Sequence, residues 1–164
     1  MSAADFPGVG LQDAITALAV MPGYLDAALA TASPGELTLR PNDDGFSLLE
    51  QACHLRDLER EGYLVRVRRI LAEETPALEP FDGAAVAKAR DYLGADAHAA
   101  ARDFAAARRE VVALIAPLTA ADLARPATFD GDRITLADLI AMMCEHDRGH
   151  RQEIEALVDA TEAP

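Results

Sequence analysis

The sequence has no tryptophan, only two cysteines and few basic residues. Its 15 lysines and arginines stand against 28 aspartates and glutamates, which gives a formal net charge of −13 at pH 7. A nucleic-acid-binding protein neutralises phosphates with a clustered basic surface, so this charge balance argues against a nucleic-acid partner. The one basic cluster, Arg66, Arg68 and Arg69, is interleaved with apolar residues, and we interpret it as the solvated face of a helix.

Signals for disulfides, secretion and membrane insertion are also missing. Cys53 and Cys144 form no C-x-x-C motif, and we interpret both as small core residues. The beginning of the chain lacks the charged-then-apolar layout of a signal peptide. The longest apolar run, AITALAVM, is broken by Pro22-Gly23 and is too short to span a bilayer. We therefore expect a reduced, cytoplasmic protein without a membrane partner.

The residues that are present favour helices. Hydrophobic residues make up 51% of the chain but aromatics only 5%, and alanine, leucine and charged residues dominate over β-branched ones. This composition favours helix over strand. A chain of 164 residues is typical of one domain with its own core. The sequence therefore predicts a single all-α domain over residues 1–164.

The apolar periodicity predicts a four-helix bundle with long connecting loops. The four long helices are expected near residues 11–32, 47–74, 95–118 and 136–160. Capping boxes mark two of their starts, Ser47 with Glu50 and Thr135 with Asp138. Pro22 predicts a kink or restart in the first helix, because proline removes a backbone donor.

Shorter elements are expected between the long helices. Residues 84–93 have a weaker helical pattern, and Thr119 is positioned to cap a short helix. The segment RPATFDGDRI predicts an irregular loop with a small hairpin around Asp130-Gly131, since Asp-Gly favours a tight hairpin turn.

Two histidines lie four residues apart in CEHDRGHRQEI, residues 144–154, where the apolar stripe of the last helix would otherwise continue. This spacing stacks His146 and His150 on one helical face. His54, on the second long helix, would join them if the two helices are neighbours. Three neutral imidazoles that converge in a bundle form a metal site with open positions. The alternative is ordinary hydrogen-bonded core histidines. We expect His98, in an alanine-rich stretch, at the surface.

Other site types fit the sequence less well. A zincin needs H-E-x-x-H, but Asp147 follows His146 and no third ligand lies downstream. A ferritin-like di-iron site needs a Glu-x-x-His from each of two helices, and no glutamate lies three residues before His54, His146 or His150. By helical phase neither cysteine faces these histidines, so a Cys-His nucleophile is not supported.

Several segments, taken in order, resemble the DinB-like family of four-helix proteins, which includes thiol-dependent S-transferases. The resemblance spans about residues 11–158 and rests on RPNDDGFSLLEQACHLRDLE, EETPALEPFD, FAAARREVVALIAPLTAADLARPAT and HDRGHRQEI. In that family a histidine of the second helix and an H-x-x-x-H pair of the fourth bind a divalent metal. The resemblance therefore implies His54, His146 and His150 as ligands. One departure is Phe46, which stands where the family usually has tryptophan before a serine.

The resemblance also implies cofactors and a reaction. We expect a divalent metal, with zinc or nickel first and iron or manganese next, because imidazoles suit such ions better than calcium or magnesium. A low-molecular-weight thiol is the second expected cofactor, and the main expectation is transfer of that thiol to an electrophilic small-molecule substrate. The alternatives are a metal-dependent hydrolase and a non-enzymatic dimeric stress or binding protein.

Four further residues are candidates to support the site. Asp57, Asp147 and Glu153 lie close enough in sequence to hold imidazole N–H groups. Arg108 matches a position where the family often has arginine, and it is a candidate partner for an internal carboxylate or an anionic substrate. The second helix is apolar on more than one side, for example at Leu64 and Val65, and family members often pair. We therefore expect a homodimer.

Overall fold

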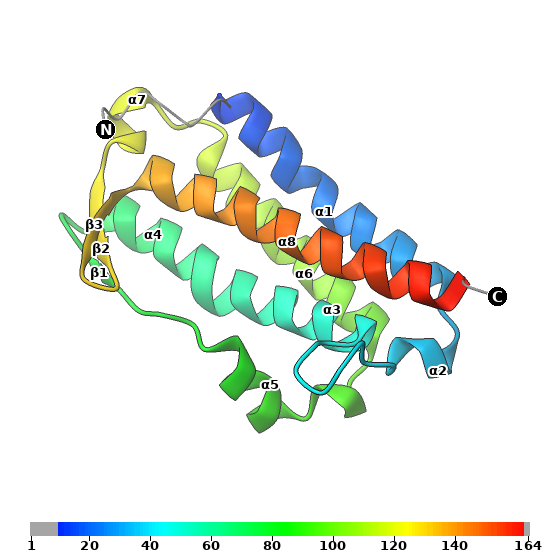
Figure 1. Ribbon diagram of the computed structural model, residues 1–164. Helices are drawn as coiled ribbons and strands as arrows, with labels where there is room; N and C mark the ends of the chain where they lie inside the picture. The colour runs from blue at the N-terminus through cyan, green and yellow to red at the C-terminus, as the bar shows by residue number, and fades with distance from the viewer. Residues whose placement is uncertain (1–9, 163–164) are drawn as a thin grey trace.

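The computed structural model describes residues 10–162 and consists mainly of four long helical segments. These are α1 (Leu11–Thr31), a continuous segment of α3 (Leu48–Asp57), η1 (Leu58–Tyr63) and α4 (Leu64–Ala72), then α6 (Ala97–Ile115) and α8 (Leu136–Glu162). Both α1 and the α3–α4 segment contact α6 and α8, so the four segments enclose one elongated core (Figure 1). The expected all-α four-helix bundle is confirmed.

Short elements connect the long ones. They are α2 (Pro34–Leu37), β1 (Ala77–Leu78), α5 (Gly83–Arg90), η2 (Tyr92–Gly94), α7 (Ala120–Leu123), β2 (Pro126–Phe129) and β3 (Asp132–Thr135). β1 pairs in parallel with β2, and β2 pairs antiparallel with β3, which makes a small sheet at one end of the bundle (Figure 1). The turn between β2 and β3 has φ of 50° at Asp130 and 84° at Gly131, as the predicted Asp-Gly hairpin requires.

The predicted helix starts are confirmed by their hydrogen bonds. The Ser47 hydroxyl accepts from the Glu50 amide, and the Glu50 carboxylate accepts from the Ser47 amide at 2.9 Å. Thr135 and Asp138 make the same reciprocal pair at the start of α8. These caps fix where α3 and α8 begin, and therefore the helical phase of the histidines that follow.

The expected restart of the first helix is wrong, because α1 continues through Pro22. Proline has no amide to offer the carbonyl of Leu18, four residues earlier. That carbonyl instead accepts a hydrogen bond of 2.9 Å from Nη1 of Arg108, on α6. The uninterrupted helix is also long and apolar enough to cross a membrane, contrary to the shorter run seen in the sequence. Its buried residues are part of the bundle core, and one helix of this length and composition is weak evidence for a membrane span.

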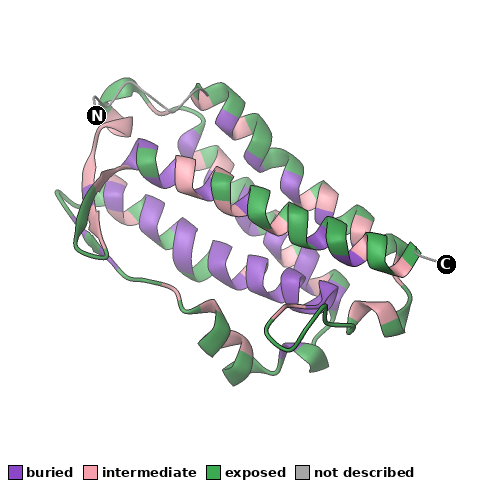
Figure 2. Ribbon diagram, in the orientation of Figure 1, coloured by how far each residue is buried: buried purple, intermediate pink, exposed green. Residues whose placement is uncertain are grey.

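The α3–α4 segment is the most enclosed of the four (Figure 2). Leu64, Val67 and Ile70 are buried within this chain, whereas Val65 is 43% exposed. Most of the apolar surface that suggested a homodimer is therefore used inside the protomer. The sequence predicted one regular helix here, but the middle turn, η1, is a π-helix in which the Leu64 amide donates to the Glu59 carbonyl. Such wider turns are frequent at functional sites.

Candidate metal centre

The structure brings the three predicted histidines together between α3 and α8. Ring centroids lie 4.3 Å apart for His146 and His150, 4.9 Å for His54 and His150, and 5.6 Å for His54 and His146. One ring nitrogen from each residue lies within 4.8 Å of the other two. Nitrogens that each sit about 2.0–2.1 Å from one ion must be this close to each other. The geometry fits a three-histidine metal site.

His54 differs from the buried acidic and amide side chains of α3 and η1. All four of those have partners: Glu50 pairs with Arg40, Gln51 with Glu153, Asp57 with Tyr92 and Glu59 with Arg108. His54 is only 8% exposed, and its buried Nδ1 has no hydrogen-bond partner among the described residues. The buried Nδ1 of His146 has none either. Unpartnered buried polar atoms are costly, so these two rings are not ordinary hydrogen-bonded core histidines.

The third ring, His150, is held by two polar neighbours. Its Nδ1 lies 2.6 Å from Oε1 of Gln51 and 3.0 Å from Oε2 of Glu153. The Gln51 amide nitrogen donates to the same Glu153 oxygen at 2.7 Å, which fixes the orientation of the amide. Because both neighbours of Nδ1 are acceptors, the proton of a neutral His150 resides on Nδ1. The lone pair of Nε2 then faces His146, whose Nε2 lies 2.9 Å away.

The environment keeps the three imidazoles neutral. Burial, together with His150, lowers the pKa of His54 to about 4, and burial with the neighbouring histidines lowers that of His146 to about 3. Burial also lowers the pKa of His150, although the Glu153 carboxylate opposes the shift. A metal binds only the neutral ring, so the site needs no deprotonation step near pH 7.

Three aromatic rings lie next to the triad. The rings of Phe46 and Phe81 lie 5.4 Å and 6.3 Å from His54, and the ring of Tyr63 lies 5.8 Å from His146. Phe46 thus occupies the place where the family usually has tryptophan, and it contacts a candidate ligand. Burial raises the pKa of Tyr63 to about 12, so its hydroxyl stays protonated at neutral pH.

A pocket of about 390 Å³ opens directly beside His150. It lies between the loop 41–46, the start of α5 and the last turns of α8, and Phe46 and Gln51 also line it. The charged residues in its lining, Asp44 and Glu153, are both acidic. The pocket is large enough for a small molecule in contact with His150, the one member of the triad that lines it.

Two of the predicted supporting residues do not contact the histidines. The Asp57 carboxylate is occupied by Arg56, Arg90 and Tyr92. The Asp147 carboxylate points away from the site and pairs with Arg108 at 2.5 Å. Asp147 directly follows His146 on α8, and adjacent residues on a helix point about 100° apart, so its carboxylate cannot face the same side as the His146 ring. Glu153 does support His150, as the preceding distances show.

Arg108 pairs with internal carboxylates, which is one of its two predicted roles. Its Nε lies 2.6 Å from Glu59, and it contacts Asp147 and the Leu18 carbonyl as well. The side chain is 2% exposed, and the two carboxylates raise its pKa against the opposing effect of burial. This group ties η1, α8 and α1 to α6, and it supports the helices on which the histidines lie.

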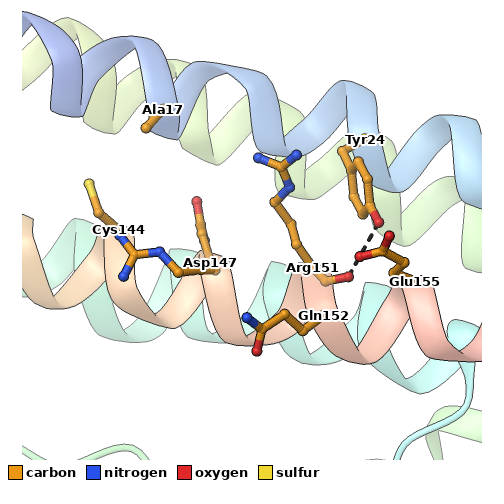
Figure 3. Close-up of a pocket in the computed structure, with 8 residues that line it drawn as sticks. Ala17, Tyr24, Cys144, Asp147, Arg151, Gln152 and Glu155 are labelled. Carbon is orange, nitrogen blue, oxygen red and sulfur yellow. Dashed lines mark hydrogen bonds between the residues drawn. The ribbon is translucent and has the colours of Figure 1, made fainter.

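Neither cysteine belongs to the triad. Cys53 is fully buried, and burial raises its pKa to about 11, so the thiol is protonated and unreactive. Cys144 lines a separate pocket of about 350 Å³ between α1 and α8, together with Tyr24 and Arg151 (Figure 3). Its pKa is also raised by burial. The site therefore has no thiol nucleophile of its own.

The sequence reasoning missed Gln51, Tyr63 and Phe81 as parts of the site. Gln51 lies three residues before His54, and this shared helical face was the available signal. The π-helical turn sets the direction of the Tyr63 side chain, and Phe81 lies in an irregular connection. Neither position can therefore be predicted from helical or strand periodicity in the sequence. His98 is exposed on α6, as expected.

The profile of the DinB superfamily matches residues 17–154. The chain belongs to the DinB superfamily. Among solved structures, YfiT from Bacillus subtilis, described as a probable metal-dependent hydrolase with an unusual four-helix bundle topology, has the same fold. The TM-score is 0.86 at 24% identity, and the match covers 94% of this chain and 89% of that chain. At this identity the likeness establishes the fold alone. No curated protein matches the chain.

Proposed function

We propose that this DinB-superfamily protein is a divalent-metal-dependent enzyme that hydrolyses a small-molecule substrate in the pocket beside His150. The observation that carries the proposal is the convergence of three neutral imidazoles, with one ring nitrogen of each within 4.8 Å of the other two. Zinc or nickel suits three imidazoles best, and iron or manganese is the next choice. A divalent ion at this position supplies Lewis-acid activation of a nucleophile.

The donor set supports a catalytic rather than a structural site. Structural zinc sites are normally closed by four protein ligands, whereas catalytic sites have three and leave a position open. Within residues 10–162 the group of potential ligands contains His54, His146 and His150 and no fourth member. Because both thiols are protonated and Cys144 lies in another pocket, neither cysteine is the nucleophile in this proposal.

The residues around the triad have separate tasks in this proposal. Gln51 and Glu153 hold the Nδ1 proton of His150 and so direct its Nε2 lone pair into the site. Phe46 and Phe81 exclude bulk water from the His54 side, which strengthens electrostatic interactions within the site. The protonated Tyr63 hydroxyl is available to donate a hydrogen bond near His146.

We infer that water rather than a thiol is the nucleophile. The described residues that line the pocket beside His150 include acidic side chains and no basic one, so the carboxylates of a thiol such as glutathione have no basic partner in this pocket, and an anionic group of the substrate has to lie outside it. The description of YfiT as a probable metal-dependent hydrolase agrees with this choice. Transfer of a low-molecular-weight thiol to an electrophile is the second candidate, and the family resemblance supports it.

Activity assays on metal-loaded and metal-free protein distinguish these candidates. We expect hydrolysis of small esters or amides by the metal-loaded protein without added thiol, and its loss after chelation or in His150→Ala. His98→Ala, at an exposed histidine, is the matched control. Turnover of monochlorobimane that requires glutathione, bacillithiol or mycothiol would favour the transferase instead. Metal binding without either activity would favour a binding protein.

A further inference from the structure

Arg66, on α4, is a buried cation without a carboxylate partner. Arg66 is only 6% exposed. Its Nε and Nη2 both donate to one acceptor, the Glu79 carbonyl, at 3.3 Å and 2.9 Å. No carboxylate of residues 10–162 forms an ion pair within 4.0 Å of its guanidinium, and Asp130 acts on it only from farther away. The expectation that Arg66 belongs to a solvated face is therefore wrong.

Arg108, the other buried arginine, shows what a satisfied guanidinium looks like in this fold. Its five N–H groups have acceptors on Glu59, Asp147 and Leu18. Arg66 has one carbonyl oxygen instead, and its Nη1 has no hydrogen-bond partner among the described residues. Burying a charge without a counter-ion is costly. The comparison therefore identifies Arg66 as the buried arginine that lacks an anionic partner among the described residues.

The guanidinium of Arg66 and the imidazole of His146 both lie against the ring of Tyr63. The Cζ atom of Arg66 is 5.4 Å from the centre of the Tyr63 ring and 4.8 Å from that of Phe129. The Tyr63 ring in turn lies 5.8 Å from that of His146. Among the described residues the Tyr63 hydroxyl has no hydrogen-bond partner either, and both it and Nη1 of Arg66 remain accessible to solvent. The Tyr63 ring therefore separates a guanidinium that has no carboxylate partner among the described residues from the candidate metal centre.

We infer that Arg66, with the Tyr63 hydroxyl, binds an oxyanion group of the substrate, so that the substrate is an anionic small molecule such as a carboxylate. The inference rests on the proposed metal site, because the reactive end of the same molecule lies at the triad. A guanidinium presents a planar fork of donors that matches a carboxylate or phosphonate. The surrounding rings of Tyr63 and Phe129 lower the local dielectric and strengthen that pair.

Matched small anions test this assignment on the metal-loaded protein. Succinate has two carboxylates, whereas succinamate keeps one and replaces the other by a neutral amide of similar shape. Calorimetric titration gives their affinities, and the absorption spectrum of cobalt-substituted protein reports contact with the metal. 3-Phosphonopropionate tells whether a phosphonate is accepted in place of the second carboxylate. The variants are Arg66→Met, Arg66→Lys and, as the control on the same helix, Arg68→Met at an exposed arginine.

We expect wild-type protein to bind succinate about tenfold or more tightly than succinamate, and Arg66→Met to abolish the difference while metal affinity is unchanged. Arg66→Lys should restore part of the preference for succinate over succinamate, and Arg68→Met should behave as wild type. Arg66→Met should also maintain or raise the melting temperature, since it removes an unpaired buried charge.

The inference is overturned if wild-type protein does not discriminate between succinate and succinamate, or if Arg66→Met discriminates as wild type does. Arg66 would have a structural role instead if both Arg66 variants showed a strongly reduced melting temperature while Arg66→Lys and Arg66→Met still preferred succinate. Failure of the wild-type protein to bind metal would refute the proposed function instead. In that case the calorimetric preference for succinate still decides whether Arg66 binds an oxyanion.

Discussion

Gly83 lies directly against the imidazole of His54. A β-carbon at Gly83 would be 2.6 Å from Cε1 and 2.8 Å from Nδ1 of that ring, which is closer than real contacts allow. Gly83 is the first residue of α5, and Asp82 caps the helix by accepting from the Ala85 amide at 3.0 Å. The start of α5 therefore sets how far the ring of His54 can swing out of the triad.

This contact predicts that Gly83→Ala weakens metal binding. The added methyl group displaces the His54 ring, and displaced ligand support typically costs about 10–100-fold in metal affinity. Gly149→Ala is the control, since Gly149 adjoins His150 in sequence but has nothing within 4 Å of an added β-carbon. Competition titration with a chromophoric chelator measures both affinities. Equal affinities in the two variants would show that α5, rather than His54, gives way.

The hydrogen bond between Gln51 and His150 supports a second prediction. Gln51→Leu preserves the apolar part of the side chain but removes the acceptor that holds the Nδ1 proton, so the ring loses its preferred tautomer. Metal affinity should fall by about tenfold or more. Gln152→Leu, at an exposed glutamine on α8, should leave it unchanged. Wild-type affinity in Gln51→Leu would mean that Glu153 alone orients the ring.

The buried group around Arg108 should be essential for stability. Arg108→Met leaves the carboxylates of Glu59 and Asp147 buried without a counter-ion, and breaking such a pair costs about 3–5 kcal/mol. Urea denaturation followed by circular dichroism measures the change. Arg109→Met, at the exposed next position of α6, is the control. A loss below about 1 kcal/mol in Arg108→Met would show that the pair contributes little beyond a hydrophobic replacement.

The lowered histidine pKa values predict how the stability of the metal-free protein depends on pH. Below about 6.5 the unfolded chain protonates its histidines, whereas folded His54 and His146 stay neutral until about 4 and 3. The unfolded state then binds more protons, so the free energy of unfolding falls as pH drops from about 6.5. Each of the two residues should contribute on the order of 1–2 kcal/mol between pH 6.5 and 5.

Urea denaturation at pH 7.5 and 5.5 checks this direction, with His54→Gln as the variant that should flatten the dependence. A His98→Gln control should keep it, because His98 is exposed. Stability that is constant or rises on acidification would contradict the burial of neutral imidazoles. The same pKa values indicate that metal occupancy persists below pH 6.5, lower than an ordinary histidine would allow.

Local signals allowed much of this fold to be predicted. The capping boxes at Ser47 and Thr135 fixed the helical phase that places His54 opposite His146 and His150, and the Asp130-Gly131 turn identified the hairpin. Each of these depends on residues within a few positions of one another. The positions of the three histidines in space also follow from phase once the helices pack as neighbours.

Long-range contacts explain what the sequence did not reveal. Arg66 looks solvent-exposed by sequence because its neighbours include two other arginines, yet the β1–α5 connection and Phe129 cover it. Pro22 suggested a helix break because proline leaves the Leu18 carbonyl without its usual donor. The replacement donor is Arg108, which lies on another helix and far away in the sequence. Asp57 and Asp147 were assigned to the histidines by proximity in sequence, whereas their partners come from distant segments.

Metal stoichiometry in histidine variants tests the central claim most directly. Purified protein loaded with zinc or nickel should contain one ion per chain, measured by elemental analysis after removal of excess metal. His54→Ala, His146→Ala and His150→Ala should each lose that ion, and His98→Ala should retain it. Wild-type protein that binds no ion, or a His150→Ala variant with unchanged stoichiometry and affinity, would contradict the three-histidine metal centre.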